Sequence, residues 1–156
     1  MRGRTVLGDD GLDDGLSLAE RILDSAGDAV IFADRSGTIR RFNRAAEALF
    51  GFSAEEALGQ SLDLIVPEHL RGPHWRGFDA AMKTGKLKLE GRPTLTRALH
   101  KSGRKLYVEM TFALVTADGK ASGAVAVARD VTERVERERA ARSAGVGASA
   151  ASGGSR

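Results

Sequence analysis

The sequence predicts an α+β domain, in which a five-stranded antiparallel sheet carries a helical insert on one face and a helix at each end. Three observations predict it. β-Branched and aromatic residues crowd residues 103–130, and the turn signal Asp118-Gly119 divides them into two long strands. A shorter pair of strands is indicated at residues 28–42. Helical patterns occupy most of the chain between the two sets of strands.

The chain begins with a Gly-rich, charged segment, residues 1–11, which we expect to be disordered. Residues 12–27 are expected to form an amphipathic helix. Its apolar stripe consists of Leu12, Leu16, Ala19, Leu23 and Ala26. This helix either caps the sheet or pairs with a second copy of itself.

Residues 28–34 and 38–42 are the first two strands, joined by the turn at residues 35–37. Asn43 is the residue type that caps a helix, which predicts a short helix over residues 44–50 that ends at Gly51. Ser53 and Glu56 have the spacing of a capping box and open a second short helix. Residues 61–66 form a third short turn before Pro67.

The longest helix of the insert is expected at residues 67–85, beginning or bending at Pro73. Helical spacing places one set of residues on a common face: Leu70, His74, Gly77, Phe78, Ala81 and Met82. Residues 86–99 follow as a long strand with an irregularity at Arg92-Pro93. Proline cannot donate to a strand ladder, so we expect either a bulge or an edge position there.

The last strand runs directly into a charged helix at residues 131–142, and residues 143–156 form a Gly/Ala/Ser tail that we expect to be disordered. The core is therefore assigned to residues 28–130. Because the last strand runs directly into a solvated helix, we expect that a change in the sheet can move the helix.

Composition excludes several classes of function. The 156 residues suit one domain, and the 24 Lys and Arg against 21 Asp and Glu are too scattered for a nucleic-acid footprint. The absence of cysteine excludes disulfides, thiolate catalysis and thiol adducts. No apolar run is long enough to span a membrane, and the N-terminus lacks the apolar region of a signal peptide. We therefore expect a cytoplasmic protein that does not contact the membrane. No phosphate loop or nucleophile–base pair indicates an enzyme.

Several stretches together resemble the PAS domain family of the S-box type. They are DAVIFADRSGTIRRFNRAAEALFGFSAEEALGQSLDLIVPEH, the helix that ends in MKTG, the stretch HKSGRKLYVEMTFALV, and ARDVTER. The resemblance covers residues 16–134 and implies the PAS fold and a sensory or dimerisation module of bacterial signal transduction. It also implies a homodimer and a signalling partner such as a kinase or a transcription regulator. With no output domain in the chain, that partner is reached in trans unless the chain is a fragment of a larger sensor.

The stretch VPEHLRGPHWRGFDAAMKTG is similar to the long helix of the rhizobial oxygen-sensor kinases, which bind haem b. This resemblance implies that His74 is the iron ligand. It also implies that Met110 and Phe112 line the distal side and that Leu89 is an apolar wall residue. Phe78 completes the predicted pocket.

Other positions depart from the kinase pattern. Thr94 replaces the arginine that steadies bound oxygen, Arg92 lies two residues away, and Met110 becomes a candidate sixth ligand. Trp75, Ala80 and Lys88 also differ from the kinases.

Alternatives to haem stay open. A lone histidine on a helix face is commonly a packing residue, so a ligand-free interaction module is the main alternative. Flavin ranks below haem, and a small binding enzyme on the same fold ranks last.

The resemblance also implies that Asp130 and Thr132 tie the end of the sheet to the outgoing helix and transmit a signal. A short oxygen-bearing side chain at this position can cap the first free amides of the helix.

Overall fold

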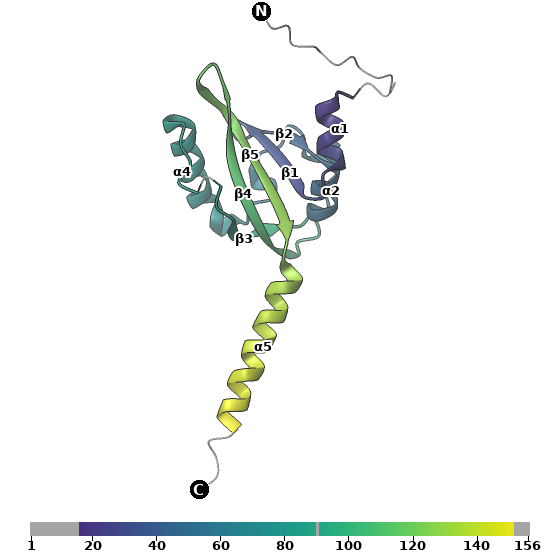
Figure 1. The fold of residues 1–156 in the computed structure, drawn as a ribbon, viewed down its shortest axis with the longest axis vertical. Coiled ribbons are helices and arrows are strands. Elements are labelled where there is room, and N and C mark those ends of the chain that lie inside the picture. Colours follow the sequence, from purple (N-terminus) through teal and green to yellow (C-terminus); the bar gives the residue numbers. More distant parts are fainter. Residues whose placement is uncertain (1–15, 90, 152–156) are drawn as a thin grey trace, which may run out of the picture.

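The computed structural model describes residues 16–89 and 91–151, with side chains up to residue 146, and it contains a five-stranded antiparallel sheet (Figure 1). The strands lie in the order β2–β1–β5–β4–β3. Their bounds are β1 (Ala29–Asp34), β2 (Ile39–Phe42), β3 (Thr94–Leu99), β4 (Lys105–Ala117) and β5 (Lys120–Asp130). The predicted α+β class and five-stranded antiparallel sheet are confirmed.

The register of the sheet decides which side chains share a face. β4 and β5 pair so that Met110 lies opposite Ala128 and Phe112 lies opposite Ala126. β3 joins the other edge of β4, with Thr94 opposite Met110. Because side chains alternate along a strand, these residues point to one side of the sheet, which we call the inner face.

The helical insert covers the inner face, because it connects β2 at one edge of the sheet to β3 at the other. It consists of α2 (Arg44–Phe50), α3 (Ala54–Ala57), the 3₁₀ turn η1 (Leu62–Leu64) and α4 (Glu68–Thr84). Three local predictions are confirmed here. Asn43 caps α2, Gly51 ends it in a left-handed conformation, and Ser53 and Glu56 form the capping box of α3.

The two terminal helices differ in extent from the predictions. α1 (Leu18–Ser25) begins at a capping box between Ser17 and Glu20, and not at Leu12. α5 (Thr132–Ala151) continues beyond Arg142, because the following segment is rich in alanine, the best helix former. Residues 1–15 and 152–156, which include the expected disordered N-terminus and part of the tail, lie outside the described residues.

The connection between α4 and β3 also differs from the prediction. α4 begins at Glu68 with Pro67 as its N-cap, and Pro73 lies inside the helix. The strand predicted from residue 86 starts only at Thr94. Gly91 adopts a left-handed conformation (φ 70°), and Pro93 has no amide to donate, so the chain cannot enter the ladder before Thr94.

The core lies between the inner face and the insert. Its largest fully buried side chains are Phe50, Ile31, Ile39, Leu106 and Val108. A smaller cluster joins Phe78 and Met82 of α4 to Ala121 of β5. Within the described residues, no helix combines the length and the apolar character needed to cross a membrane.

Candidate ligand-binding cavity

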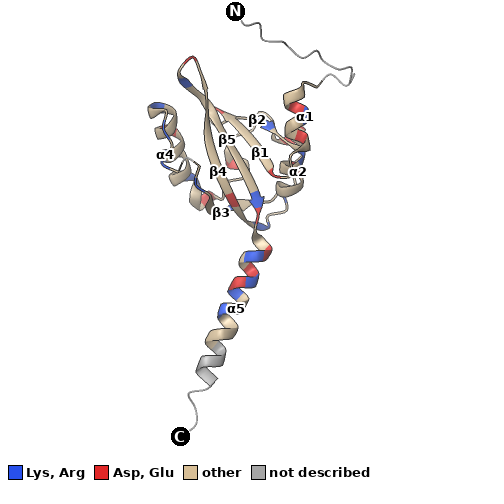
Figure 2. Ribbon diagram, viewed as in Figure 1, with Lys and Arg blue, Asp and Glu red and all other residues tan. Residues whose placement is uncertain are grey.

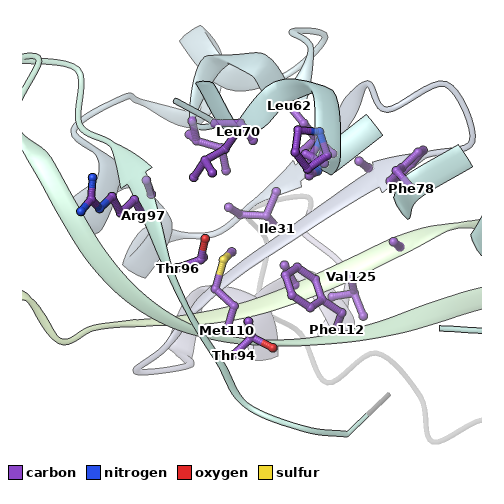
Figure 3. A pocket seen from close by; sticks show the side chains of 18 residues that line it. Ile31, Leu62, Leu70, Phe78, Thr94, Thr96, Arg97, Met110, Phe112 and Val125 are labelled. Atoms are coloured by element: carbon purple, nitrogen blue, oxygen red, sulfur yellow. The ribbon is translucent and has the colours of Figure 1, made fainter. Parts of the chain in front are cut away.

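A cavity of about 330 Å³ lies between the inner face of the sheet and α4 (Figure 3). The sheet contributes Ile31, Ala33, Thr94, Thr96, Arg97, Ala98, Met110, Phe112, Ala124, Val125 and Ala126. The insert contributes Leu62, Ile65, Val66, Leu70, Pro73, His74 and Phe78. This volume falls at the lower end of the range for small-molecule sites, about 300–1,000 Å³.

Small side chains in β5 leave this space. Ala124 and Ala126 point toward α4 from the middle of the sheet, where larger residues would fill the gap. Ile31, Met110 and Phe112 stand on the neighbouring strands and form the sides of the hollow. The cavity therefore follows from the alternation of alanine and valine in β5.

The cavity wall is almost wholly apolar. Its polar side chains are those of Thr94, Thr96, His74 and Arg97. Figure 3 shows the guanidinium group of Arg97 directed away from the other lining side chains. That group lies 5.5 Å from the ring centroid of Tyr107. Two hydroxyl groups and one imidazole are thus the polar groups available to a ligand.

His74 is the central polar residue of this wall. Burial lowers the pKa of its imidazole, and the nearby carboxylates of Asp63 and Asp79 only partly oppose this effect. The ring is therefore neutral at pH 7. Its Nδ1 atom is buried and has no hydrogen-bond partner among the described residues. Buried polar atoms without partners are rare in folded proteins, and an unexplained one indicates a functional role.

Trp75 and Asp63 hold α4 over the cavity. The indole Nε1 of Trp75 donates to Oδ1 of Asp63 at 2.8 Å. Arg71 lies 3.7 Å from the same carboxylate and also donates to the backbone oxygen of Val66. The Trp75 ring lies against Gly37, in the turn between β1 and β2. These contacts fasten α4 both to η1 and to that turn.

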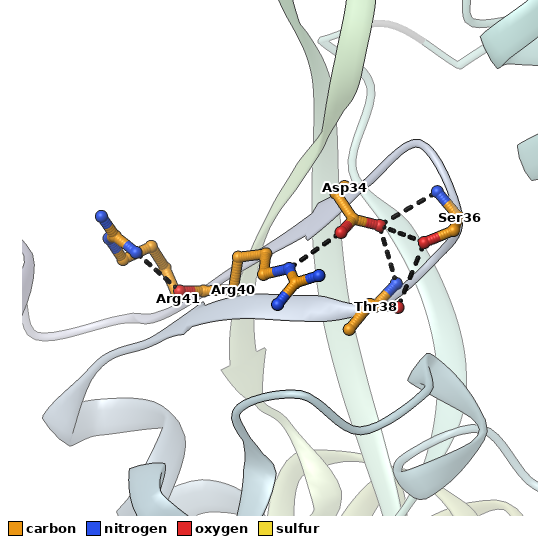
Figure 4. Close-up of polar contacts among 5 residues, drawn as sticks. All are labelled: Asp34, Ser36, Thr38, Arg40 and Arg41. Carbon is orange, nitrogen blue, oxygen red and sulfur yellow. Dashed lines mark hydrogen bonds and ion pairs between the residues drawn. The ribbon is translucent and has the colours of Figure 1, made fainter.

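The turn that receives Trp75 is organised by Asp34 (Figure 4). Its Oδ1 accepts hydrogen bonds from the amides of Ser36 and Thr38 and from the hydroxyl of Ser36. Its Oδ2 accepts from Arg40 at 2.8 Å. The bonds from Ser36, followed by the one from Arg40, lower the pKa of Asp34 to about 2. The group stabilises a turn and is not itself a binding site.

The structure brings together four of the predicted site residues, namely His74, Phe78, Met110 and Phe112. The assignment of Leu89 and Arg92 to the pocket is wrong. Both side chains are exposed in the α4–β3 loop and lie outside the cavity lining, because the strand starts after them.

Sequence reasoning also missed residues that form or support the cavity. These are Ile31, Thr96, Ala124 and Asp63. The alternation of small residues in β5 could have indicated Ala124. No local signal links Trp75 to Asp63.

The junction with α5 is tightly hydrogen-bonded. Asp130 accepts from the amide of Thr132 at 2.9 Å, and the Thr132 hydroxyl accepts from the amide of Tyr107 at 2.9 Å. The amide of Val131 donates to the carbonyl of Tyr107. The first turn of α5 is thus fixed to β4.

The domain thus combines an antiparallel sheet, an apolar cavity beneath a helical insert and a projecting C-terminal helix. A family model described as the PAS fold matches residues 23–136. The chain belongs to the PAS family.

Three relatives share parts of this domain. An uncharacterized protein of Azorhizobium caulinodans is 35% identical over 120 residues, which cover 76% of this chain and 16% of that protein. The oxygen sensor protein DosP of Escherichia coli is 29% identical over 90 residues, covering 58% of this chain and 11% of DosP. The sensor protein FixL of Bradyrhizobium diazoefficiens is 45% identical over 53 residues, covering 34% of this chain and 10% of FixL.

Solved structures agree on the fold. The PAS domain of a Colwellia psychrerythraea protein superposes with a TM-score of 0.64 at 23% identity, covering 74% of this chain and 95% of that one. The PAS domain of the Cronobacter turicensis quorum-sensing receptor RpfR, in complex with C12:0, gives 0.54 at 19% identity, covering 69% and 96%.

Proposed function

We propose that this PAS domain is a sensory module that binds haem b in the cavity beneath α4, with His74 as the iron ligand. Ligand-dependent change is passed through the Asp130–Thr132 junction to α5 and so to a partner in trans. The domain is non-catalytic and cytoplasmic in this proposal. Bound haem would supply an iron centre that takes up a small gas molecule or changes redox state.

The observation that carries the proposal is the state of His74. Histidine binds metals as neutral imidazole, and burial keeps His74 neutral. Its Nδ1 lacks a partner, and the surrounding wall offers almost no other polar group. The described residues contain no group of three or more His, Cys, Asp or Glu side chains that could hold a bare metal ion. A single imidazole in an apolar wall fits the donor chemistry of a porphyrin-held iron.

The names of two relatives support a sensory role. DosP is named as an oxygen sensor and FixL as a sensor protein. This chain spans 16% or less of each of the three relatives. In this proposal the partner is a kinase or a transcription regulator. We further propose a homodimer through α1, where Leu18 and Ile22 are 73% and 60% exposed.

The other lining residues would set what the site accepts. Met110 brings its thioether sulfur into the cavity and is a candidate sixth ligand. Thr94 and Thr96 offer hydroxyl groups, and the charged group of Arg97 points away. The aliphatic walls exclude water from the site.

The test is an absorption spectrum of protein expressed with a supply of haem. We expect a Soret band that is lost in His74→Ala and kept in His69→Ala, because His69 lies exposed at the start of α4 and outside the lining. A colourless wild-type protein, or a His74→Ala variant with an unchanged band, would contradict the proposal.

A second candidate follows from the apolar character of the wall. A cavity of about 330 Å³ with two hydroxyl groups and one imidazole also suits a medium-chain acyl ligand, and the RpfR PAS domain was solved with C12:0. Addition of dodecanoic acid would then raise the melting temperature of wild-type protein but not of Ala126→Leu, in which a larger side chain fills the cavity. A colourless protein without this shift favours the ligand-free interaction module.

A further inference from the structure

Two arginines from different elements share the ring of Tyr107. The guanidinium carbon of Arg97, on β3, lies 5.5 Å from the ring centroid, and that of Arg139, on α5, lies 4.8 Å from it. Both distances are within the range in which a cation is attracted to an aromatic face. Tyr107 itself stands on β4, directly opposite Arg97 in the sheet register.

The backbone around Tyr107 already fixes the start of α5. Its amide donates to the Thr132 hydroxyl, and its carbonyl accepts from the amide of Val131. Further along the helix, Arg134 pairs with Glu109 of β4 at 3.4 Å, and Arg139 reaches the Tyr107 ring. Figure 2 shows charges of both signs crowding the first half of α5. Arg139 therefore carries contact between α5 and the sheet beyond the first turn of the helix.

Arg97 connects the same ring to the cavity. It belongs to the stretch of β3 that lines the cavity, between Thr96 and Ala98. A ligand that displaces this strand also displaces the guanidinium group of Arg97 relative to the Tyr107 ring. The two arginines carry the same charge, so each weakens the hold of the other on the ring.

We propose that Arg97 and Arg139 compete for Tyr107, so that the wall of the cavity controls how firmly α5 is docked on the sheet. Docking of α5 is strengthened when Arg97 leaves the ring and weakened when it approaches. The competition between the arginines stands on the contacts above. Its control by a ligand rests on the proposed function.

The competition can be measured by double electron–electron resonance, because the chain has no native cysteine to interfere with spin labelling. Labels at Ala113→Cys on β4 and Ala141→Cys on α5 report the docked fraction of the helix. We expect Arg139→Gln and Tyr107→Leu to lower the ratio of docked to released helix about two- to five-fold, the factor typical of an exposed cation–aromatic contact. Arg97→Gln is expected to raise this ratio.

Two controls separate the competition from general damage. Arg137→Gln removes an arginine whose partner is Glu133 on the same helix, and it is expected to leave the docked fraction unchanged. Tyr107→Phe keeps the aromatic ring and is expected to behave as wild type, which matters if Tyr107→Leu does not fold. High salt is expected to reduce the effect of Arg97→Gln, since the two cations are exposed. Loss of docking in Arg97→Gln, or wild-type docking in Arg139→Gln, overturns the competition.

The link to the cavity is tested by repeating the measurement with and without haem b. Haem is expected to change the docked fraction in wild type and to have a smaller effect in Arg97→Gln. If no Soret band forms, the proposed function fails while the variants without haem still decide the competition. If the band forms and haem shifts both proteins equally, control through Arg97 is wrong and the proposed function stands.

Discussion

The indole ring of Trp75 lies directly over Gly37 and leaves no space for a Cβ atom at that position. Gly37 also has φ of 78°, in the region that favours glycine. The helix that covers the cavity, α4, thus rests on the turn between β1 and β2. The hydrogen bond from Trp75 to Asp63 fixes the ring in this seat.

Gly37→Ala is expected to loosen α4. The left-handed conformation alone costs an L-residue about 1–2 kcal/mol, and overpacking against the ring adds about 1–3 kcal/mol. Gly119→Ala is the matched control, because Gly119 has φ of 75° and nothing within 4 Å of its Cβ position. Urea unfolding should show a larger loss for Gly37→Ala. Trp75 is the single tryptophan, so its emission should shift to the red in this variant alone. Equal losses in the two variants would show that the ring is not a constraint.

Asn43→Asp is expected to be strongly destabilising, although it keeps the oxygen that caps α2. The Asn43 side chain accepts from the amides of Val30 and Ala46 and donates to the carbonyls of Leu23 and Asp28. Aspartate cannot donate, so two carbonyls lose their partner and face a buried charge. We expect a loss of about 2–4 kcal/mol in the free energy of unfolding.

Ser53→Ala is the comparison for Asn43→Asp, because it removes only an exposed cap and should cost about 1 kcal/mol. Equal losses in the two variants would mean that the contacts of Asn43 to α1 and the segment before β1 contribute nothing.

Asn43 also illustrates why much of the fold could be predicted from the sequence. A helix cap, a capping box and the Asp118-Gly119 turn are local signals. Each depends on residues that lie within a few positions of the helix or strand end that they determine. The predicted boundaries of β3 and α5 were wrong, because neighbouring residues with opposite preferences decide where each element starts or ends. The strand before Thr94 is blocked by Gly91 and Pro93, and the alanines after Arg142 extend α5.

The candidate site was only partly predictable for the same reason. His74, Phe78, Met110 and Phe112 lie on elements whose periodicity was correctly predicted, so they meet in the cavity. Leu89 was placed on a strand that is a loop at that position. Trp75 contacts Gly37 and Asp63 through the packing of the whole insert, and nothing in the spacing of these residues indicates that contact.

Asp34→Asn is expected to remove part of the acid sensitivity of the protein. The folded pKa of Asp34 is lowered from 3.8 to about 2, so its contribution to stability is present above pH 3.8 and is lost as the pH falls toward 2. The variant should be less stable than wild type at pH 7, and the difference should shrink between pH 4 and 2. Urea unfolding at several pH values measures this. A constant difference over that range would show that the bonds of Fig. 4 do not depend on the charge.

His74→Phe is expected to change the pH dependence of stability at higher pH, between pH 7.5 and 5. Burial lowers the folded pKa of His74 below its ordinary value of 6.5, so the unfolded chain binds a proton more readily than the folded one. The stability that comes from a neutral His74 is complete above pH 6.5 and decreases as the pH falls below that value. Phenylalanine fills a similar space without a titrating group or an unpartnered Nδ1. Unfolding free energies between pH 7.5 and 5 should therefore fall less steeply in His74→Phe than in wild type, while His69→Phe, at an exposed position, should follow wild type. Parallel curves for wild type and His74→Phe would mean that the imidazole is solvated in the folded protein, and a solvated ring at this position could not serve as the buried iron ligand that we propose.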